Sequence, residues 1–306
     1  MTGRRIGIAL GGGSARGWAH IGVLEVLQEA GFAPTLVAGT SMGALVGGAW
    51  VAGSIDALKA WALQVDRRRI AGMIDVNLRT GGLMDGQRIN GFLCGLGLDR
   101  DVGELPTAYT AVATDLAAGD EVWLRHGSLV SAIRASIAIP GIISPCRIDG
   151  RWLVDGGLAN QIPISACRAM GADIVVAVNV NAGLLAKHAA GFSNAEPDTA
   201  RIAEILEQVP ARLYPLADRV LPQLMAGGPQ RPGYFEALAA SFSIVQDKLA
   251  AARLAEAPPD VMIMPEVAAI SLMEFDRAEE AIRAGRAATE AVLERIETLV
   301  ACDGPV

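Results

Sequence analysis

TLVAGTSMGALVGGAWVA, residues 35–52, is the stretch of sequence that decides the fold. Its beginning, Thr35–Ala38, is a short apolar run typical of a buried strand, and Ala44–Ala52 is typical of a helix. Between them lies the GxSxG sequence Gly39-Thr40-Ser41-Met42-Gly43. A tight strand-to-helix turn raises a serine hydroxyl above the sheet, and small flanking residues relieve the crowding of that turn. Ser41 is therefore a candidate nucleophile and Gly39 and Gly43 its elbow, while the alternative is a glycine-rich helix start that only packs closely.

A similar unit precedes this stretch in the chain. Ile6–Leu10 is predicted to be a buried strand that ends in a glycine loop, and Ala19–Ala30 a helix. The order strand, helix, strand, helix favours a parallel sheet with crossover helices. Asp149-Gly150 predicts the turn of a hairpin. Further strands are predicted at 109–114, 121–125, 173–180 and 261–264, further helices at 129–136 and 164–170, and mostly helix over 55–98.

The composition excludes several classes of protein. Of 306 residues, 52% are hydrophobic and 19% charged, which excludes a disordered chain. The formal charge of −7 without a basic block argues against nucleic-acid binding. Residues 30–55 carry no charge, but their polar and glycine residues favour a buried strand, turn and helix over a membrane span. Four cysteines without CxxC spacing indicate reduced thiols in a cytoplasmic protein, and no metal or cofactor is expected.

A second glycine-rich turn, Gly11-Gly12-Gly13-Ser14-Ala15-Arg16-Gly17, joins the first strand to the first helix. No Gly-Lys-Ser/Thr follows it, so it is not a P-loop, and Ser14 spoils the dinucleotide-binding fingerprint. Taken alone, it is more typical of a structural turn. One βα unit before a nucleophile elbow, its backbone N–H groups favour an oxyanion hole.

The candidates for the general base that would activate Ser41 are few, because the chain has only three histidines. His20 follows the glycine loop on a helix, His126 precedes a turn, and His188 lies in a loop-like stretch. A Ser-Asp-His triad would need His188, which stays open as an alternative. Asp155, at the end of a strand and before Gly156-Gly157, is the better candidate, because a carboxylate can accept the serine proton directly. Asp115 and Asp149 are rival acids, expected to be structural.

Together these motifs resemble the patatin-like phospholipase family, and more closely its compact bacterial members, which are similar to the catalytic domain of neuropathy target esterase. The similarity covers about residues 6–180. Its blocks, in family order, are Gly11–Gly17 running into Trp18–Leu24, Gly39–Gly43, Ala135–Gly141 and the DG[AG] motif Asp155-Gly156-Gly157. Ser271, Phe275, Ala278, Ile282 and Gly285 are similar to the C-terminal tail of the bacterial members. The chain departs from the family at Ile143, where the family often has Phe, and this leaves the shape of the acyl pocket open.

The resemblance implies a three-layer α/β sandwich with a mainly parallel central sheet and a Ser-Asp dyad. Ser41 would attack the ester carbonyl, Asp155 would take its proton, and an acyl-enzyme would form. The resemblance also implies that backbone N–H groups of Gly11, Gly12, Gly13 and Ser14 form the oxyanion hole.

Three parts of the chain are expected to have different roles. Residues 1–195 are predicted to be the catalytic α/β domain, 196–258 a helical insert of uncertain role, and 259–306 a C-terminal strand and helix that pack back on the core. The leading hypothesis is a serine acyl hydrolase of the lipase, phospholipase or lysophospholipase type that acts on lipid esters in the cytoplasm. Peripheral contact with the inner membrane face and homo-oligomer formation are further hypotheses. The alternatives are an α/β-hydrolase-type esterase that uses Ser41 with His188, and a non-catalytic regulator that binds a lipid or a protein.

Overall fold

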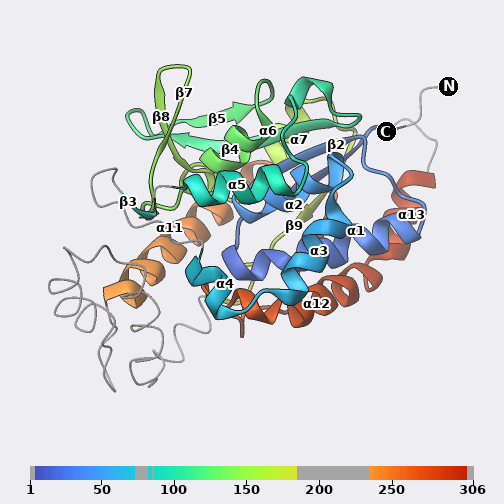
Figure 1. Cartoon of the computed structure of the whole chain (residues 1–306). Coiled ribbons are helices and arrows are strands. Elements are labelled where there is room, and N and C mark those ends of the chain that lie inside the picture. Colours follow the sequence, from blue (N-terminus) through green and yellow to red (C-terminus); the bar gives the residue numbers. More distant parts are fainter. Residues whose placement is uncertain (1–3, 73–81, 85, 185–233, 302–306) are drawn as a thin grey trace, which may run out of the picture.

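A large mixed sheet with helices on both faces forms the centre of the molecule (Figure 1). The computed structural model describes residues 4–72, 82–84, 86–184 and 234–301. Within them, the strand order is β10-β9-β1-β2-β4-β8-β7, with β5 also paired to β4. The strands are β1 (Ile6–Leu10), β2 (Leu36–Thr40), β4 (Ala108–Asp115), β5 (Glu121–Leu124), β7 (Cys146–Ile148), β8 (Arg151–Asp155), β9 (Ile174–Val178) and β10 (Val261–Ile263).

Helices connect and cover these strands. The α-helices are α1 (Ala19–Glu29), α2 (Met42–Val51), α3 (Ile55–Gln64), α4 (Arg67–Gly72), α5 (Gln87–Gly95), α6 (Leu129–Ser136), α7 (Ile164–Ala169), α11 (Tyr234–Glu256), α12 (Ala278–Glu290) and α13 (Leu293–Ala301). Short 3-10 helices occur at η1 (Ser14–Trp18), η2 (Val102–Glu104), η3 (Gly156–Leu158) and η5 (Phe275–Arg277). The prediction of an α/β sandwich with a mainly parallel sheet is confirmed.

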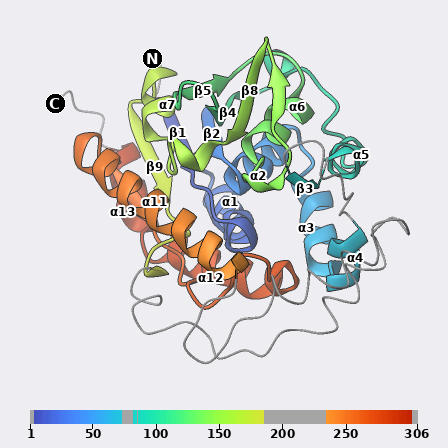
Figure 2. The ribbon, with the colours of Figure 1, turned by 90° about the vertical axis from the view of Figure 1, so that its left-hand side faces the viewer.

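The parallel half of the sheet is buried on both faces. β10, β9, β1, β2 and β4 run parallel to one another, and the side chains of the first four alternate between two hydrophobic clusters. In β1, Ile8 and Leu10 join the larger cluster, which includes side chains of α1, α2 and α12. Ala9 points to the smaller cluster, formed with α7 and Ala250 of α11. Figure 2 shows α7 and α11 on one side of the sheet and α1 and α2 on the other, which gives three layers.

α1 and α12 pack at very close range. A Cβ atom on Gly22 would collide with the carbonyl oxygen of Ile282, and one on Gly285 with that of Ala19. Arg286 adds ion pairs with Glu25 and Glu29 of α1. Glycine on both helices therefore fastens the C-terminal part of the chain to the first βα unit.

One local expectation is wrong. A single helix was expected after the last strand, but α12 ends at Glu290 and α13 begins at Leu293. At this point the Thr289 hydroxyl donates to Gly285 O, and Val292 N bonds only three residues back, which ends the helix. The stretch 55–98 was expected to be mostly helical, and its described residues hold α3, α4 and α5 as predicted. They also hold the short strand β3 (Gly82–Met84), which pairs with β6 (Gly141–Ile143).

Other local expectations are confirmed. Asp149 and Gly150 both have positive φ, as a type I′ hairpin turn between β7 and β8 requires. The uncharged stretch 30–55 folds into β2 and α2 with their flanking turns. In the part of the chain that the structure describes, no helix combines the length and apolarity needed to cross a bilayer. Of the predicted insert, 234–256 is helical, and 196–233 lies outside the described residues.

Candidate active site

Ser41 occupies the sharp turn between β2 and α2. Its φ of 53° and ψ of −119° are unusual for a residue with a side chain. The turn is crowded, because a Cβ atom on Gly39 would collide with Gly43 O and one on Gly43 with Leu10 O. Both glycines are therefore required by the geometry, and the N-terminus of α2 directs its positive end toward Ser41.

Ser136, at the end of α6, holds this turn from outside. The backbone N–H of Ser41 donates to Ser136 Oγ at 2.8 Å, and the Ser136 hydroxyl donates to Val112 O of β4 at 2.5 Å. The residue belongs to the predicted Ala135–Gly141 block, but the sequence pattern indicated no role for it. A hydroxyl that both accepts and donates ties the elbow to the central sheet.

Asp155 lies near the Ser41 turn because both β2 and β8 pair with β4. β2 runs parallel to β4 and ends with Thr40 opposite Val112, whereas β8 runs antiparallel and ends with Asp155 opposite Ala113. β5 occupies the other edge of β4 over the same residues, so β2 and β8 share one edge and meet end to end. Ser41, which directly follows β2, and Asp155, the last residue of β8, therefore lie next to each other at the edge of β4.

The Asp155 carboxylate is almost fully buried, with 1% of the residue exposed. Its Oδ1 accepts a hydrogen bond from Gly157 N at 2.8 Å, and its buried Oδ2 has no hydrogen-bond partner among the described residues. Burial raises the pKa of Asp155 to about 6, although the nearby Ser41 hydroxyl and the hydrogen bond from the Gly157 amide both lower the pKa. The Ser41 hydroxyl is thus close enough to influence the carboxyl, but it does not complete a well-aligned hydrogen bond to Oδ2.

Gly156 and Gly157 allow close packing next to the acid. A Cβ atom on Gly156 would collide with Val112 O, and one on Gly157 with the side-chain amide of Gln246. Gln246 is a buried residue of α11, so the described part of the predicted insert reaches the Asp155 motif. Nothing in the sequence indicated this contact.

The glycine loop lies beside Ser41, since a Cβ atom on Gly12 would be 3.3 Å from Ser41 Cβ. The four candidate donors in this loop are not equivalent. Gly11 N donates to Val178 O at 3.1 Å, and Gly12 N donates to Gln161 O at 3.0 Å. These two amides are already used, which corrects the expectation that all four face the substrate. Among the described residues, the N–H groups of Gly13 and Ser14 have no acceptor, and Ser14 has a φ of 49°.

The histidines do not offer a base within the described residues. His20 is fully buried and its Nε2 donates to Gly11 O at 2.7 Å, so it supports the glycine loop from below. Burial lowers the pKa of His20 to about 4, which favours the neutral ring. His126 lies in the turn beside Gly103, and His188 lies outside the described residues. The hypothesis that His188 is the base therefore stays untested.

The two rival acids have local roles. Asp115 Oδ1 accepts from Ala117 N and Ala118 N in a turn, and Asp115 lies 3.9 Å from the Arg151 guanidinium. Asp149 forms the β7–β8 turn. No group of three His, Cys, Asp or Glu side chains in the described ranges is arranged to hold a metal ion.

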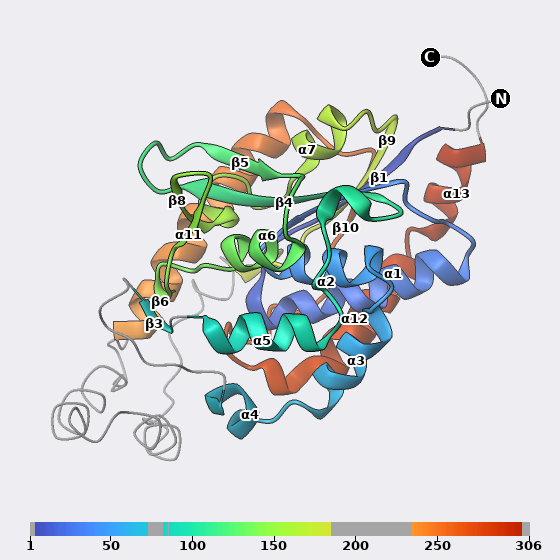
Figure 3. The same cartoon turned by 45° about the horizontal axis from the view of Figure 1, so that its top comes forward.

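An apolar pocket of about 140 Å³ opens beside Ser41. Aromatic side chains from separate elements form part of its wall: Trp18, Trp61 of α3, Phe92 of α5 and Phe275. Trp61 and Phe92 are in contact, with ring centroids 4.4 Å apart. Figure 3 shows α3, α4 and α5 close together on this side of the molecule. Ile143, the position where the chain departs from the family pattern, also lines the pocket.

The chain is similar to several known proteins. A family model described as patatin-like phospholipase matches residues 8–168. An uncharacterized NTE family protein of Mycobacterium tuberculosis is 35% identical over 335 residues, which cover 96% of this chain and 92% of that protein. Patatin-like phospholipase domain-containing protein 6 of Mus musculus is 33% identical over 187 residues, which cover 59% of this chain and 14% of that protein. The solved structure of VipD from Legionella pneumophila aligns with a TM-score of 0.48 and 14% identity, over 96% of this chain and 67% of that one.

Proposed function

The chain belongs to the patatin-like phospholipase family and is a lipid hydrolase, and from this premise we propose that it cleaves carboxylic esters of lipids with a Ser41–Asp155 dyad. The observation that carries the proposal is the end-to-end meeting of β2 and β8 on one edge of β4. That arrangement supports a direct proton transfer from Ser41 to Asp155, without a histidine between them.

The dyad works in two halves. Ser41 Oγ attacks the ester carbonyl carbon while Asp155 Oδ2 accepts the hydroxyl proton, and the proton then passes to the leaving alkoxide. The product is an alcohol and an acyl-enzyme ester on Ser41. In the second half, Asp155 takes a proton from water, the water oxygen attacks the acyl carbon, and the proton returns to Ser41 as the fatty acid leaves.

We assign the oxyanion hole to the N–H groups of Gly13 and Ser14. Gly11 and Gly12 instead shape the loop through their bonds to Val178 O and Gln161 O. Gln161 Nε2 also donates to Gly12 O at 2.7 Å, so this residue holds Gly12 from both sides. Two preorganised amides near a developing oxyanion stabilise the transition state by about 3–4 kcal/mol per donor.

The apolar pocket supports an acyl chain as the part of the substrate that binds beside Ser41. Exposed apolar side chains on α11, with Ile244 at 44% and Val245 at 52% exposure, support a second proposal, peripheral contact with a lipid surface. The same exposed face would serve a homo-oligomer. We place this activity in the cytoplasm, at the inner membrane face.

Intact mass after incubation with a fluorophosphonate tests the dyad. The wild type is expected to gain one adduct, Ser41→Ala none, and Asp155→Asn an adduct only at a strongly reduced rate. His188→Ala serves as the matched control and should react like the wild type. An unreactive, folded wild type would refute the proposal in favour of a non-catalytic binding protein, and loss of the adduct in His188→Ala would replace Asp155 by the histidine mechanism.

A further inference from the structure

The glycine loop is held by a part of the chain about 260 residues away in sequence. Ser14 Oγ donates to Leu272 O at 2.6 Å, and Ala15 N donates to the same oxygen at 3.2 Å. Arg16 Nη1 donates to Ile270 O at 3.3 Å, and Trp18 Nε1 donates to Phe275 O at 3.2 Å. Each of these donors lies in η1, directly after the candidate oxyanion residue Gly13.

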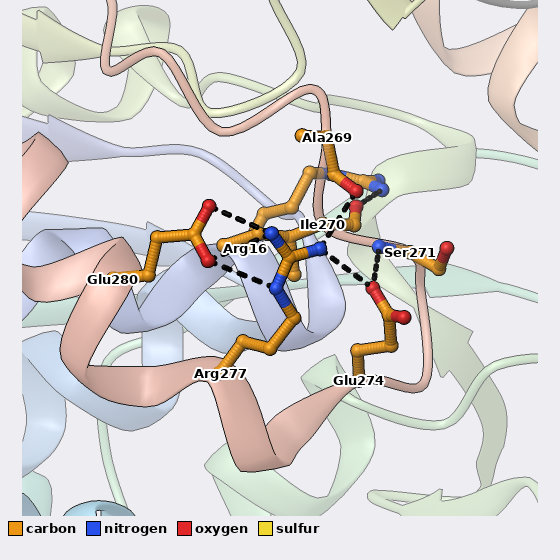
Figure 4. Close-up of polar contacts among 7 residues, drawn as sticks. All are labelled: Arg16, Ala269, Ile270, Ser271, Glu274, Arg277 and Glu280. Carbon is orange, nitrogen blue, oxygen red and sulfur yellow. Dashed lines mark hydrogen bonds and ion pairs between the residues drawn. The ribbon is translucent and has the colours of Figure 1, made fainter.

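The acceptors lie in residues 269–275, which we call the clamp segment. Arg277 fixes this segment from its C-terminal side (Figure 4). Its Nη1 donates to Ala269 O at 2.9 Å and to Glu274 Oε2 at 3.1 Å, and its Nε and Nη2 bind the Glu280 carboxylate at 2.7–2.9 Å. Glu274 Oε2 also accepts from Ser271 N at 2.7 Å. One guanidinium thus joins both ends of the clamp segment to α12.

Arg16 shows how strongly the loop depends on these carbonyls. Arg16 is only 4% exposed, and its Nε donates to Asn181 Oδ1 at 3.1 Å. In the described part of the chain, Arg16 has no carboxylate within ion-pair distance. A buried guanidinium needs acceptors for its N–H groups, so the Ile270 carbonyl is part of what keeps this residue in place.

Ser14 makes the connection to the chemistry. A left-handed backbone is unfavourable for a residue with a side chain, and Ser14 adopts it with a φ of 49°. The hydrogen bond from Ser14 Oγ to Leu272 O opposes this cost and ties Ser14 to the clamp segment. The clamp segment is therefore linked to the same residue that supplies a candidate oxyanion donor.

We propose that the clamp segment sets the position of the Gly13 and Ser14 amides, and that Arg277 is a positioning residue for ester hydrolysis. The inference rests on the proposed function, because it assigns a role in the transition state and not in folding alone. Moving a donor by about 1 Å costs about 100-fold in rate, so release of the clamp segment is expected to lower kcat by about 10- to 100-fold.

Hydrolysis of p-nitrophenyl butyrate by the full chain tests the proposal, with Ser41→Ala as background. Arg277→Ala should lower kcat by about 10- to 100-fold, and Arg277→Lys, which keeps the charge without the fork, by less. Arg286→Ala is the matched control, since Arg286 lies in α12, the helix that follows Arg277, and also binds glutamates, but on α1. It should lose a similar amount of thermal stability while kcat stays within about twofold.

Coupling to Ser14→Ala separates positioning from general destabilisation. Ser14→Ala alone should lower kcat, and adding Arg277→Ala should lower it little further, because both changes break the same link. Adding Arg286→Ala to Ser14→Ala should change nothing in kcat. If Arg277→Ala does not fold, the single variants Ser14→Ala and Arg277→Lys decide the question.

The outcomes distinguish the two proposals. A wild type that is no more active than Ser41→Ala refutes the proposed function, and the clamp with it. An active wild type whose kcat is unchanged in Ser14→Ala and Arg277→Lys overturns the clamp alone. A loss confined to KM also overturns it, because Met273 and Phe275 line the pocket and would then matter only as its wall.

Discussion

Replacing Asp155 by Asn is expected to make the protein more stable at pH 8, although under the proposed mechanism it should abolish hydrolysis. Burial raises the pKa of this carboxyl from an ordinary 3.8 to about 6. A group whose pKa is higher in the folded protein contributes stability that is complete below the unfolded pKa and is lost as the pH rises through the folded pKa. At about 1.4 kcal/mol per pKa unit, the wild type loses about 3 kcal/mol of unfolding free energy across this window.

The Asn variant does not have this loss, because it carries no charge to bury. Its Oδ1 can still accept from Gly157 N, so the local structure is retained. The advantage of Asp155→Asn over the wild type should therefore grow by about 2–3 kcal/mol between pH 4 and pH 8. Ser41→Ala should shift the wild-type loss to higher pH, since the Ser41 hydroxyl lowers the pKa of Asp155.

Urea unfolding, followed by tryptophan fluorescence at a series of pH values, measures the difference directly. Because both proteins share every other titrating group, the difference between them reports Asp155 alone. An Asp155→Asn advantage that stays constant from pH 4 to pH 8 would refute the reasoning, since it would mean that the carboxyl ionises in the folded protein as readily as in the unfolded chain.

Three further results are expected. The kcat/KM for p-nitrophenyl butyrate should fall as the pH drops below about 6, where Asp155 becomes protonated and can no longer accept the Ser41 proton, and a profile that is flat down to pH 5 would contradict this. Ser136→Ala should lower kcat by about tenfold without unfolding the protein, because the Ser41 amide loses its acceptor; circular dichroism controls for the fold, and an unchanged kcat would show that the elbow does not need this bond. In a series of p-nitrophenyl esters, rates should decline beyond about six acyl carbons, because a pocket of 140 Å³ is close to the roughly 150 Å³ that holds a benzene molecule. Ile143→Ala should extend that limit, and equal rates for six and sixteen carbons would exclude the pocket as the acyl site.

The parts of this fold that were predictable from sequence are those set by local chemistry. Ile6–Leu10 and Leu129–Ser136 were predicted with the bounds that the structure has, since apolar runs and helical periodicity depend only on near neighbours. The Asp149-Gly150 turn followed from backbone preferences in the same way. The three-residue strand β3 carries too short a pattern to distinguish it from a helix.

In the candidate site too, the features set by local sequence were predictable and those set by long-range pairing were not. Ser41 and Asp155 were nominated from their neighbouring glycines, but their meeting depends on the register of β2 and β8 on β4, which no single motif encodes. The use of the Gly11 and Gly12 amides by Val178 and Gln161 depends likewise on partners about 150 residues or more away. Long-range pairing of this kind leaves no periodicity in a single sequence.

The bond between Ser14 and Leu272 also bears on when the enzyme becomes active during its synthesis. The two residues are 258 positions apart, so a ribosome that adds about 5–20 residues per second makes the acceptor about 13–50 s after the donor. For most of that interval the nascent chain carries Ser41, and for a little under half of it Asp155, without the carbonyls that bind the glycine loop. Under the clamp proposal, the Gly13 and Ser14 amides of a nascent chain are therefore fixed only once residues 269–275 have been made, well after Ser41 and Asp155.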